Sequence, residues 1–365
     1  MKTGITNPNT CEVDNIEEIL ERLPVKSLFR FKSVSKLWRL MIESNYLAEK
    51  RLLRHPNPKL LVLRLEISSD RCSRTIFLAT NSKDDHNDHI KIFIHSYKSP
   101  LPYPIYSMYD IAGQIMGYCN GLVCIFDLGY IYLINPATRK LRILSPEFLR
   151  AYTDRTGWSN ELPISVGFGR DMVTGTYKVI LMYLYDRHFI KTEALNLESG
   201  ERRYVHFPIL YDELGDDKRS IFANGSLYWL PKPLSLFTNK LIKLAAIDLH
   251  TETFRYVSLP SWYTKYSKSV YLWSLKDSLC LSDVQQTPRV DVWSLQQEDP
   301  SVKWEKIFSV NILSTNCLDA NFWKLGLAAY YFSSTGRYPA NNPLDQVPND
   351  HCSSVLYTEK LGSSV

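Results

Sequence analysis

The chain has 365 residues, which is long enough for two domains or for one large repeat domain. With 45% hydrophobic and 22% charged residues, its composition is that of a soluble globular protein and excludes a disordered or fibrous chain. The net charge of +5 comes from Lys and Arg residues spread along the chain without long like-charged runs, so we expect no nucleic-acid partner.

The cysteines and the apolar segments indicate the compartment. The 7 scattered cysteines include no C-x-x-C pair, which argues against a zinc ribbon, a redox motif or a disulfide framework. The first residues lack the apolar segment of a signal peptide, and no apolar run is long enough to span a membrane. The sequence therefore predicts a protein of the cytoplasm or nucleus without a membrane partner, and a disordered N-terminus over residues 1–13.

A first helix is predicted after Asp14. Apolar residues recur at the i, i+3, i+4 and i+7 spacing of one helix face: Ile16, Ile19, Leu20 and Leu23. Asp14, with Glu17 three residues later, forms a capping-box pattern. Pro24 ends this helix because proline cannot donate the helical hydrogen bond.

Two further short helices follow. The second is predicted over residues 25–31, with Val25, Leu28 and Phe31 facing inward, and the third begins near Ser33. The inward face of the third helix consists of Val34, Leu37, Trp38 and Met41. Three short helices form a marginal core, so we expect a partner to cover the apolar residues that exceed its needs. These residues are Leu20, Pro24, Leu28 and Phe29.

Residues 19–28 (ILERLPVKSL) and 30–39 (RFKSVSKLWR) resemble the F-box of plant F-box proteins, because both motifs occur in the order and at the spacing of that family. The resemblance implies a three-helix F-box over residues 14–54 that binds a Skp-family adaptor and, through it, cullin and RING subunits. Together with the uncovered apolar residues, the expected adaptor-binding residues are Leu20, Leu23, Pro24, Val25, Leu28 and Phe29. The expected F-box core is Ile16, Ile19, Phe31, Val34, Leu37, Trp38 and Met41. The chain departs from the family at Cys11-Glu12, where a Leu-Pro pair is usual.

A helix-turn-helix is the alternative for three short helices with basic residues. Lys26, Arg30 and Arg39 fall on different predicted helices, however, and no glycine marks the expected turn. The sequence therefore favours the F-box.

From Lys59 onward, apolar residues follow the spacing of strands. Short apolar runs between polar or Gly/Pro turns predict strands over residues 61–65, 90–94, 131–134 and 227–230. A recurring strand–polar turn–strand phrase predicts hairpins over residues 135–146, 196–208 and 248–260, with a degenerate copy over 292–308. Asn120-Gly121 and Asn224-Gly225 predict two-residue hairpin turns, because both central residues can adopt a positive φ.

Repeats of about fifty residues with about four short strands each are typical of β-propeller blades. Residues 59–365 would hold about six such blades, and an irregular pair of β-sandwiches is the alternative. The expected fold is therefore α+β multidomain: a small three-helix F-box followed by an all-β, propeller-like repeat domain.

Several phrases within residues 110–310 resemble the F-box-associated, kelch-like domain of plant F-box proteins. In family order they are CNGLVC (119–124), NPATR (135–139), VGFG (166–169), YKV (177–179), NGSLYW (224–229), IDL (247–249) and DVW (291–293). The resemblance implies that this domain recruits the protein to be ubiquitinated. The residues expected to be structural are Asn120, Gly121, Asn224, Gly225, Trp229 and Trp293. The target-binding residues, which the sequence does not identify, are expected on loops between blades.

Candidate chemical sites are weak. Residues 84–89 (DDHNDH) hold carboxylates and imidazoles that could bind a metal, but they lack a helical frame and are typical of a solvated loop. Asp216-Asp217 are adjacent and cannot place two carboxyl groups across a glycosidic bond. Cys119 and Cys124 are expected to be inert thiols in a buried strand pair. We therefore expect no catalytic residue, no metal site and no cofactor.

The expected function is that of a non-catalytic subunit of a cullin-RING ubiquitin ligase. In this interpretation the F-box binds the Skp-family adaptor and the β domain binds a target protein that the sequence does not identify. Two alternatives stay open: a propeller hydrolase with an unrelated helical prefix, and an F-box protein that acts outside the ligase.

Overall fold

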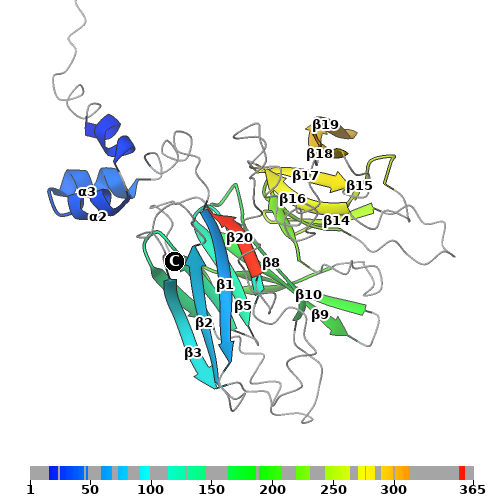
Figure 1. The fold of residues 1–365 in the computed structure, drawn as a ribbon. Helices are drawn as coiled ribbons and strands as arrows, with labels where there is room; N and C mark the ends of the chain where they lie inside the picture. Colours follow the sequence, from blue (N-terminus) through cyan, green and yellow to red (C-terminus); the bar gives the residue numbers. More distant parts are fainter. Residues whose placement is uncertain are drawn as a thin grey trace, which may run out of the picture.

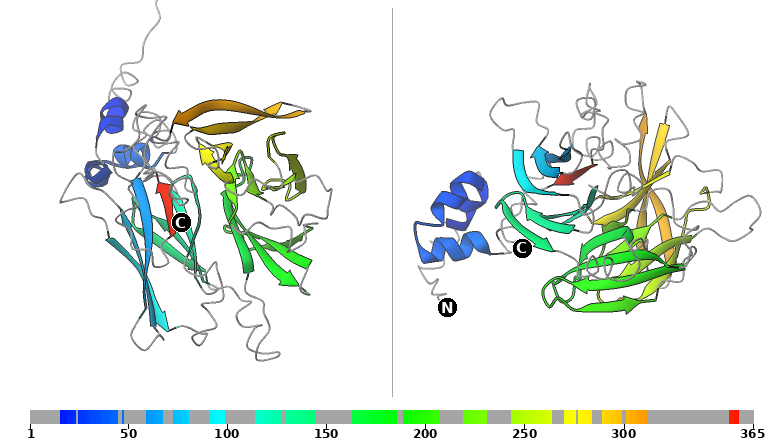
Figure 2. Two further views of the ribbon diagram at one scale, coloured as in Figure 1. Left: turned by 45° about the vertical axis from the view of Figure 1, so that its right-hand side comes forward. Right: turned by 90° about the horizontal axis from the view of Figure 1, so that it is seen from below.

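The computed structural model describes two parts of the chain, a helical head and a β-rich body (Figure 1). The helical head spans residues 16–47 and lies to one side of the β-rich body, which spans residues 59–357 (Figure 2). The described residues are 16–23, 25–44, 47, 59–67, 73–80, 91–98, 114–127, 130–144, 163–185, 189–206, 219–230, 243–263, 270–275, 277–283, 289–298, 301–311 and 353–357.

The helical head begins with a helical segment over residues 16–22, which is followed by α2 (Val25–Phe31) and α3 (Lys36–Glu43). Ser35 is the N-cap of α3, and its hydroxyl accepts a hydrogen bond from the Trp38 N–H at 3.1 Å. The helix therefore begins later than the predicted position near Ser33. Val34, which the prediction placed in this helix, therefore precedes it.

The core of the helical head collects side chains from each of these helical segments. Its buried members are Leu20, Leu28, Met41, Ile42 and Leu47, and the partly buried members are Ile16, Leu23, Phe31 and Trp38. The rings of Phe31 and Trp38 meet edge to face with centroids 5.5 Å apart, a favourable arrangement for aromatic pairs.

Several residues of the predicted F-box core lie at the surface instead. The exposed fractions are 56% for Ile19, 58% for Val34 and 49% for Leu37. Because α3 starts after Ser35, Val34 precedes the helix. Leu37 lies within the helix, on the side away from the core. Trp38, Met41 and Ile42 occupy the inner face. The prediction placed Val34 and Leu37 on one inward helix face with Met41. It is wrong for Val34 because the cap at Ser35 leaves this residue outside the helix, and for Leu37 because the packed face consists of Trp38, Met41 and Ile42.

The β-rich body contains five four-stranded antiparallel sheets among the described residues. In spatial order, the first sheet consists of β20 (Ser353–Tyr357), β1 (Lys59–Ile67), β2 (Ser73–Thr80) and β3 (Lys91–Lys98). The second consists of β4 (Gln114–Cys119), β5 (Leu122–Asp127), β6 (Tyr130–Asn135) and β7 (Lys140–Leu144). The third consists of β8 (Pro163–Arg170), β9 (Tyr177–Tyr185), β10 (Phe189–Asn196) and β11 (Arg202–Val205).

The last two sheets repeat this order. The fourth consists of β12 (Ile221–Ala223), β13 (Ser226–Trp229), β14 (Lys243–Asp248) and β15 (Phe254–Ser258). The fifth consists of β16 (Val270–Leu275), β17 (Ser278–Asp283), β18 (Arg289–Glu298) and β19 (Ser301–Asn311). The predicted hairpins therefore exist as β6–β7, β10–β11, β14–β15 and β18–β19, which confirms the repeat read from the sequence.

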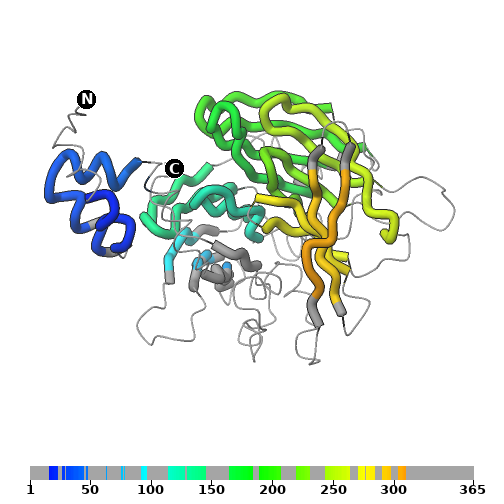
Figure 3. Tube along the Cα trace, turned by 90° about the horizontal axis from the view of Figure 1, so that it is seen from above, coloured from blue at the N-terminus to red at the C-terminus, as the bar shows by residue number. Residues whose placement is uncertain are grey.

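Sheets that follow one another along the chain lie side by side (Figure 3). A cluster of buried apolar side chains fills the space between each sheet and the next. The edge strands β20, β4, β8, β12 and β16 also contact one another in that order. Close approach of β8 to its neighbour depends on Gly169, because a methyl group there would collide with Phe222 and Leu249.

Tight turns join the first two strands of the second and fourth sheets. Asn120 and Gly121 have φ of 50° and 88°, and Asn224 and Gly225 have φ of 47° and 72°. Both predicted Asn-Gly turns are therefore confirmed, because each carries two residues with a positive φ.

A second kind of turn occurs in the second, third and fourth sheets. Each copy opens with Asn or Asp, whose side-chain oxygen accepts hydrogen bonds of 2.8–3.2 Å from the N–H groups two and three residues later. These first residues are Asn135, Asp171, Asn196 and Asp248. The fifth residue of each copy has a positive φ, and these residues are Arg139, Gly175, Gly200 and Glu252. The turn at Asp171 was not recognised in the sequence as a copy of the others.

The first sheet joins distant parts of the chain. β20 pairs with β1 in antiparallel register, with Leu61 opposite Val355, and Figure 1 shows the two strands side by side. A sixth blade would have to come from residues 312–352, which lie outside the described residues. Among the helices of the described chain, none has the length and apolar content to cross a membrane.

Candidate functional site

The predicted adaptor-binding residues do not form one exposed ridge. Leu20 and Leu28 have no exposed surface and pack at the centre of the helical head, which corrects the prediction that a partner covers them. Each leucine buried in this way contributes about 2 kcal/mol, and a head this small needs both. Leu23 is partly buried against the same cluster. Pro24 and the side chains of Val25 and Phe29 lie outside the described part of the chain.

A different apolar surface is uncovered on the helical head. Leu37 and Leu40 lie three residues apart on α3, so they share one side of the helix, and their exposed fractions are 49% and 67%. Val34, immediately before the cap, is 58% exposed. We name Val34, Leu37 and Leu40 the exposed apolar face. Leu40 was missed in the sequence, although the spacing of Trp38, Met41 and Ile42 would have placed it on the outer side.

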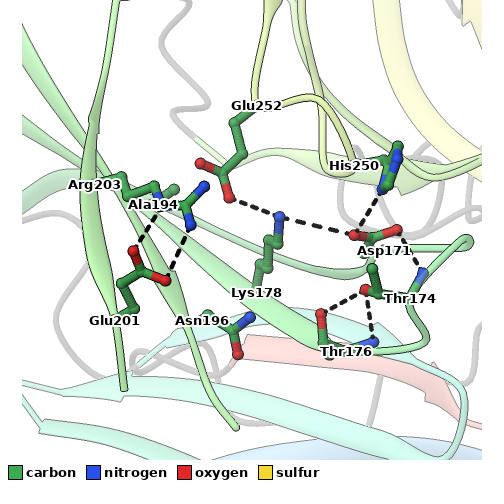
Figure 4. A pocket seen from close by; sticks show the side chains of 10 residues that line it. All are labelled: Asp171, Thr174, Thr176, Lys178, Ala194, Asn196, Glu201, Arg203, His250 and Glu252. Carbon is green, nitrogen blue, oxygen red and sulfur yellow. Dashed lines mark hydrogen bonds and ion pairs between the residues drawn. The ribbon is translucent and has the colours of Figure 1, made fainter. Parts of the chain in front are cut away.

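A charged cleft lies in the β-rich body, where turns of the third and fourth sheets meet (Figure 4). Its volume is about 230 Å³. It is lined by the β8–β9 turn, by β9 and β10, by residues 201–203 and by the β14–β15 turn. The lining residues are Asp171, Thr174, Thr176, Lys178, Ala194, Asn196, Glu201, Arg203, His250 and Glu252.

Lys178 is the central cation of the charged cleft. Its side chain is 7% exposed, and its ammonium donates hydrogen bonds of 2.6 Å to the Leu249 carbonyl and to Glu252 Oε1. Asp171 Oδ2 lies 3.8 Å from the same Nζ. Because Lys178 belongs to β9 while Leu249 and Glu252 belong to the β14–β15 turn, this ammonium joins the third sheet to the fourth.

Asp171 is held ionised. Burial by itself would raise the pKa of this carboxyl. The hydroxyl and N–H of Thr174, the N–H of Val173 and the imidazole of His250 outweigh burial and lower the pKa to about 2. The pKa of Asp171 thus lies far below neutral pH, so its Oδ2 accepts the hydrogen bond with His250 Nδ1 at 3.2 Å.

The outer wall of the charged cleft carries an exposed ion pair. Arg203 donates through Nε and Nη2 to the two carboxylate oxygens of Glu201, at 2.9 Å and 3.1 Å. This hydrogen bonding lowers the pKa of the Glu201 carboxyl and raises the pKa of the Arg203 guanidinium. Because both side chains are more than half exposed, water screens the pair and its strength is small.

Sequence reasoning did not find the charged cleft. Its residues come from turns that are far apart along the chain and meet only when the third and fourth sheets pack. The readable signal was Lys178, a lysine within the otherwise apolar strand YKVILMY. Among the residues that the structure describes, no group of at least three His, Cys, Asp or Glu side chains could hold a metal ion. The predicted candidates at residues 84–89 and 216–217 lie outside that part of the chain.

Cys119 and Cys124 lie on the adjacent strands β4 and β5 and are buried free thiols. Burial raises the pKa of Cys124, which keeps the thiol protonated and poorly nucleophilic. Trp229 is buried in the cluster between the third and fourth sheets.

Two family matches cover most of the chain. Residues 13–50 match the F-box domain, and residues 64–323 match the F-box associated beta propeller domain. The chain belongs to the F-box protein family. The resemblance seen in its two N-terminal motifs and in the repeat phrases is thereby confirmed.

Other F-box proteins with similar sequences come from Arabidopsis thaliana. One is 38% identical over 371 residues, which cover 90% of this chain and 91% of the relative. A second F-box protein is 36% identical over 88% of this chain and 65% of its own length. An F-box/kelch-repeat protein is 31% identical over 81% of this chain and 66% of its own length. This F-box protein thus spans about two thirds of the length of the second and third relatives.

Proposed function

We propose that this F-box protein is the substrate-recognition subunit of a cullin-RING ubiquitin ligase and performs no bond chemistry itself. The F-box, proposed over residues 14–54, binds a Skp-family adaptor that brings the cullin and RING subunits. The remaining chain, residues 59–365, holds a target protein in the cytoplasm or nucleus. The observation that carries this proposal is the F-box match on a helical head that leaves apolar side chains uncovered.

The exposed apolar face is the proposed site of adaptor binding. Val34, Leu37 and Leu40 place apolar surface at one end and one side of α3, where water would otherwise cover it. Burying Leu37 and Leu40 against an adaptor would contribute about 3 kcal/mol. Such a contribution corresponds to about a hundredfold in affinity.

The β-rich body is proposed to be a propeller. Support comes from the five four-stranded sheets, which follow one another in chain order with their first edge strands in mutual contact. Pairing of β20 with β1 would then close the propeller. Such a rigid body can present a bound target to the ubiquitin-conjugating enzyme at a high effective concentration, which is the catalytic contribution expected of a recognition subunit.

Binding of a purified Skp-family adaptor to the full chain tests the proposal. The Leu37→Asp, Leu40→Asp double variant is expected to bind about a hundredfold more weakly, because two charges would face an apolar adaptor surface. The matched control is Ile307→Asp, which also places a charge at an exposed apolar position but lies on β19 of the β-rich body. Control and wild type should bind alike, and circular dichroism should be the same for all three proteins.

Two results would count against the proposal. Adaptor binding by the double variant within about twofold of wild type would exclude the exposed apolar face as the contact. Absence of cullin from a complex that retains the adaptor would favour the alternative that this F-box protein acts outside the ligase.

A further inference from the structure

We propose that the charged cleft binds the guanidinium group of an arginine side chain on the target protein. This inference rests on the proposed function, because it names a recognition site and a partner chemistry for the target-binding body. It depends on residues of the third and fourth sheets, which are remote in sequence from the F-box. The two proposals can therefore fail separately.

The hydrogen-bond donors of Lys178, the buried cation of the charged cleft, are largely used within the protein. Lys178 donates to Leu249 and Glu252 and lies within ion-pair distance of Asp171. Arg203, on the exposed outer wall, uses two of its five N–H donors on Glu201. A carboxylate or phosphate that bound Lys178 would have to break the buried contacts of this ammonium, so the inner part of the cleft disfavours an anionic ligand.

Hydrogen-bond acceptors, in contrast, remain available in the charged cleft. Glu252 uses Oε1 for Lys178, and within the described residues its Oε2 makes no hydrogen bond; Figure 4 shows the two oxygens at the cleft. Asp171 is ionised and has no proton to give, so His250 must donate through Nδ1. In neutral imidazole this leaves Nε2 as a second acceptor. A ligand with several N–H donors fits such a lining.

The charge of the cleft also selects a cation. Asp171 and Glu252 supply two carboxylates, and Lys178 supplies one ammonium, which leaves one negative charge on this low-exposure group. The pair Glu201–Arg203 adds no net charge. Because the side chains of Asp171, Lys178 and Glu252 are only 1%, 7% and 16% exposed, water screens their field less than at an open surface.

A guanidinium group fits better than an ammonium. It carries five N–H donors in a planar fork and can bind a carboxylate through two parallel hydrogen bonds. Glu252 offers such a carboxylate at the inner wall, and Glu201 offers another at the outer wall once its exposed partner turns away at little cost. A cleft of about 230 Å³ has room for the side chain.

Exposed apolar residues at the rim indicate a protein partner. Met172 is 57% exposed and Val173 is 72% exposed, and both lie in the β8–β9 turn between the lining residues Asp171 and Thr174. Together they could cover the aliphatic stem of an arginine and the neighbouring residues of the target chain. A free guanidinium compound would make no use of this rim.

Titration calorimetry with defined probes on the purified full chain tests the site. The main probe is N-acetyl-arginine methylamide, and the comparison probes are the matching citrulline, lysine and glutamate derivatives. We expect the arginine probe to bind at least about tenfold more tightly than citrulline, which has the same shape without the charge. Guanidinium ion alone is expected to bind more weakly than the arginine probe, because it lacks the stem that would contact Met172 and Val173.

Matched variants assign the binding to the cleft. Glu252→Gln and Glu201→Gln should each weaken the arginine probe by about tenfold. Glu201 is exposed, so its variant stays informative if Glu252→Gln loses stability. The control is Glu198→Gln, an exposed acid on the same β10–β11 turn that does not line the cleft.

Several outcomes would overturn the inference. These are the absence of saturable arginine binding, equal binding of lysine and arginine probes, tighter binding of the glutamate probe, or weakening by Glu198→Gln equal to that by Glu201→Gln. Guanidinium ion binding as tightly as the arginine probe would point to a small-molecule site in place of a target contact. All variants should keep adaptor binding, which separates a failed cleft from a failed ligase assignment.

Discussion

Replacement of Lys178 with methionine is expected to weaken the contact between the third and fourth sheets. Methionine keeps most of the aliphatic stem and removes the ammonium, so the change leaves packing largely intact. It deprives Glu252, which is 16% exposed, of its cation and removes the donor to the Leu249 carbonyl. Both lost interactions belong to the contact between Lys178 of the third sheet and the β14–β15 turn of the fourth.

The magnitude follows from those two losses, because Asp171, 3.8 Å from the ammonium, keeps its hydrogen bonds with Val173, Thr174 and His250. A largely buried carboxylate left without its partner costs about 2 kcal/mol, and a lost hydrogen bond to a backbone carbonyl costs about 1 kcal/mol. The free energy of unfolding should therefore fall by about 3 kcal/mol for Lys178→Met. Combining it with Glu252→Gln should cost at least about 1 kcal/mol less than the sum of the single changes, because both variants remove the same interaction.

Urea unfolding followed by tryptophan fluorescence measures these differences. Lys140→Met is the control, because Lys140 is an exposed lysine on β7 next to a turn of the same kind. The control should stay within about 0.5 kcal/mol of wild type. The reasoning would be refuted if Lys178→Met matched the control, or if the costs of Lys178→Met and Glu252→Gln were additive.

Three further predictions concern the β-rich body. Gly200→Ala should lower the free energy of unfolding by about 1 kcal/mol, because φ is 72°; no atom lies within 4 Å of the added methyl, so the cost comes from the backbone alone. Arg139→Gly, at the same turn position, should raise the free energy of unfolding by about 0.5 kcal/mol. Changes of the same sign for the two variants in urea unfolding would contradict this prediction. Trp229→Phe should cost about 2 kcal/mol in the same assay, because the indole N–H donates to the Ser165 hydroxyl at 2.9 Å in the interior, and a neutral result would disprove that role. Removal of residues 353–365 should speed amide hydrogen exchange in β1 relative to β9, and unchanged protection of β1 would show that β20 contributes little.

The repeat architecture could be predicted because its signals are local. Asn-Gly pairs require a backbone conformation that few other residues adopt, so Asn120-Gly121 and Asn224-Gly225 identified their turns correctly. The apolar run at residues 131–134 likewise identified β6. The F-box motifs were recognised in the same way, from short stretches with a fixed spacing.

The errors arose where the outcome depends on packing between segments. Leu20 and Leu28 lie on separate helical segments of the head. The local sequence pattern does not tell whether these two leucines pack against each other or are covered by a partner. Leu37 and Met41 are one helical turn apart, and it is the packing of α3 through Trp38, Met41 and Ile42 that leaves Leu37 at the surface. The charged cleft could not be predicted because its walls come from two sheets whose contact no local pattern encodes.

The pairing of β1 with β20 has a consequence during synthesis. β1 is made first among the strands of the β-rich body, whereas its edge partner β20 is made only after the other four sheets. At about 10 residues per second, the open edge of β1 waits for about half a minute. Throughout that interval the nascent protein exposes a strand edge that can pair with other chains, so newly made molecules are expected to need chaperone protection until β20 has been made.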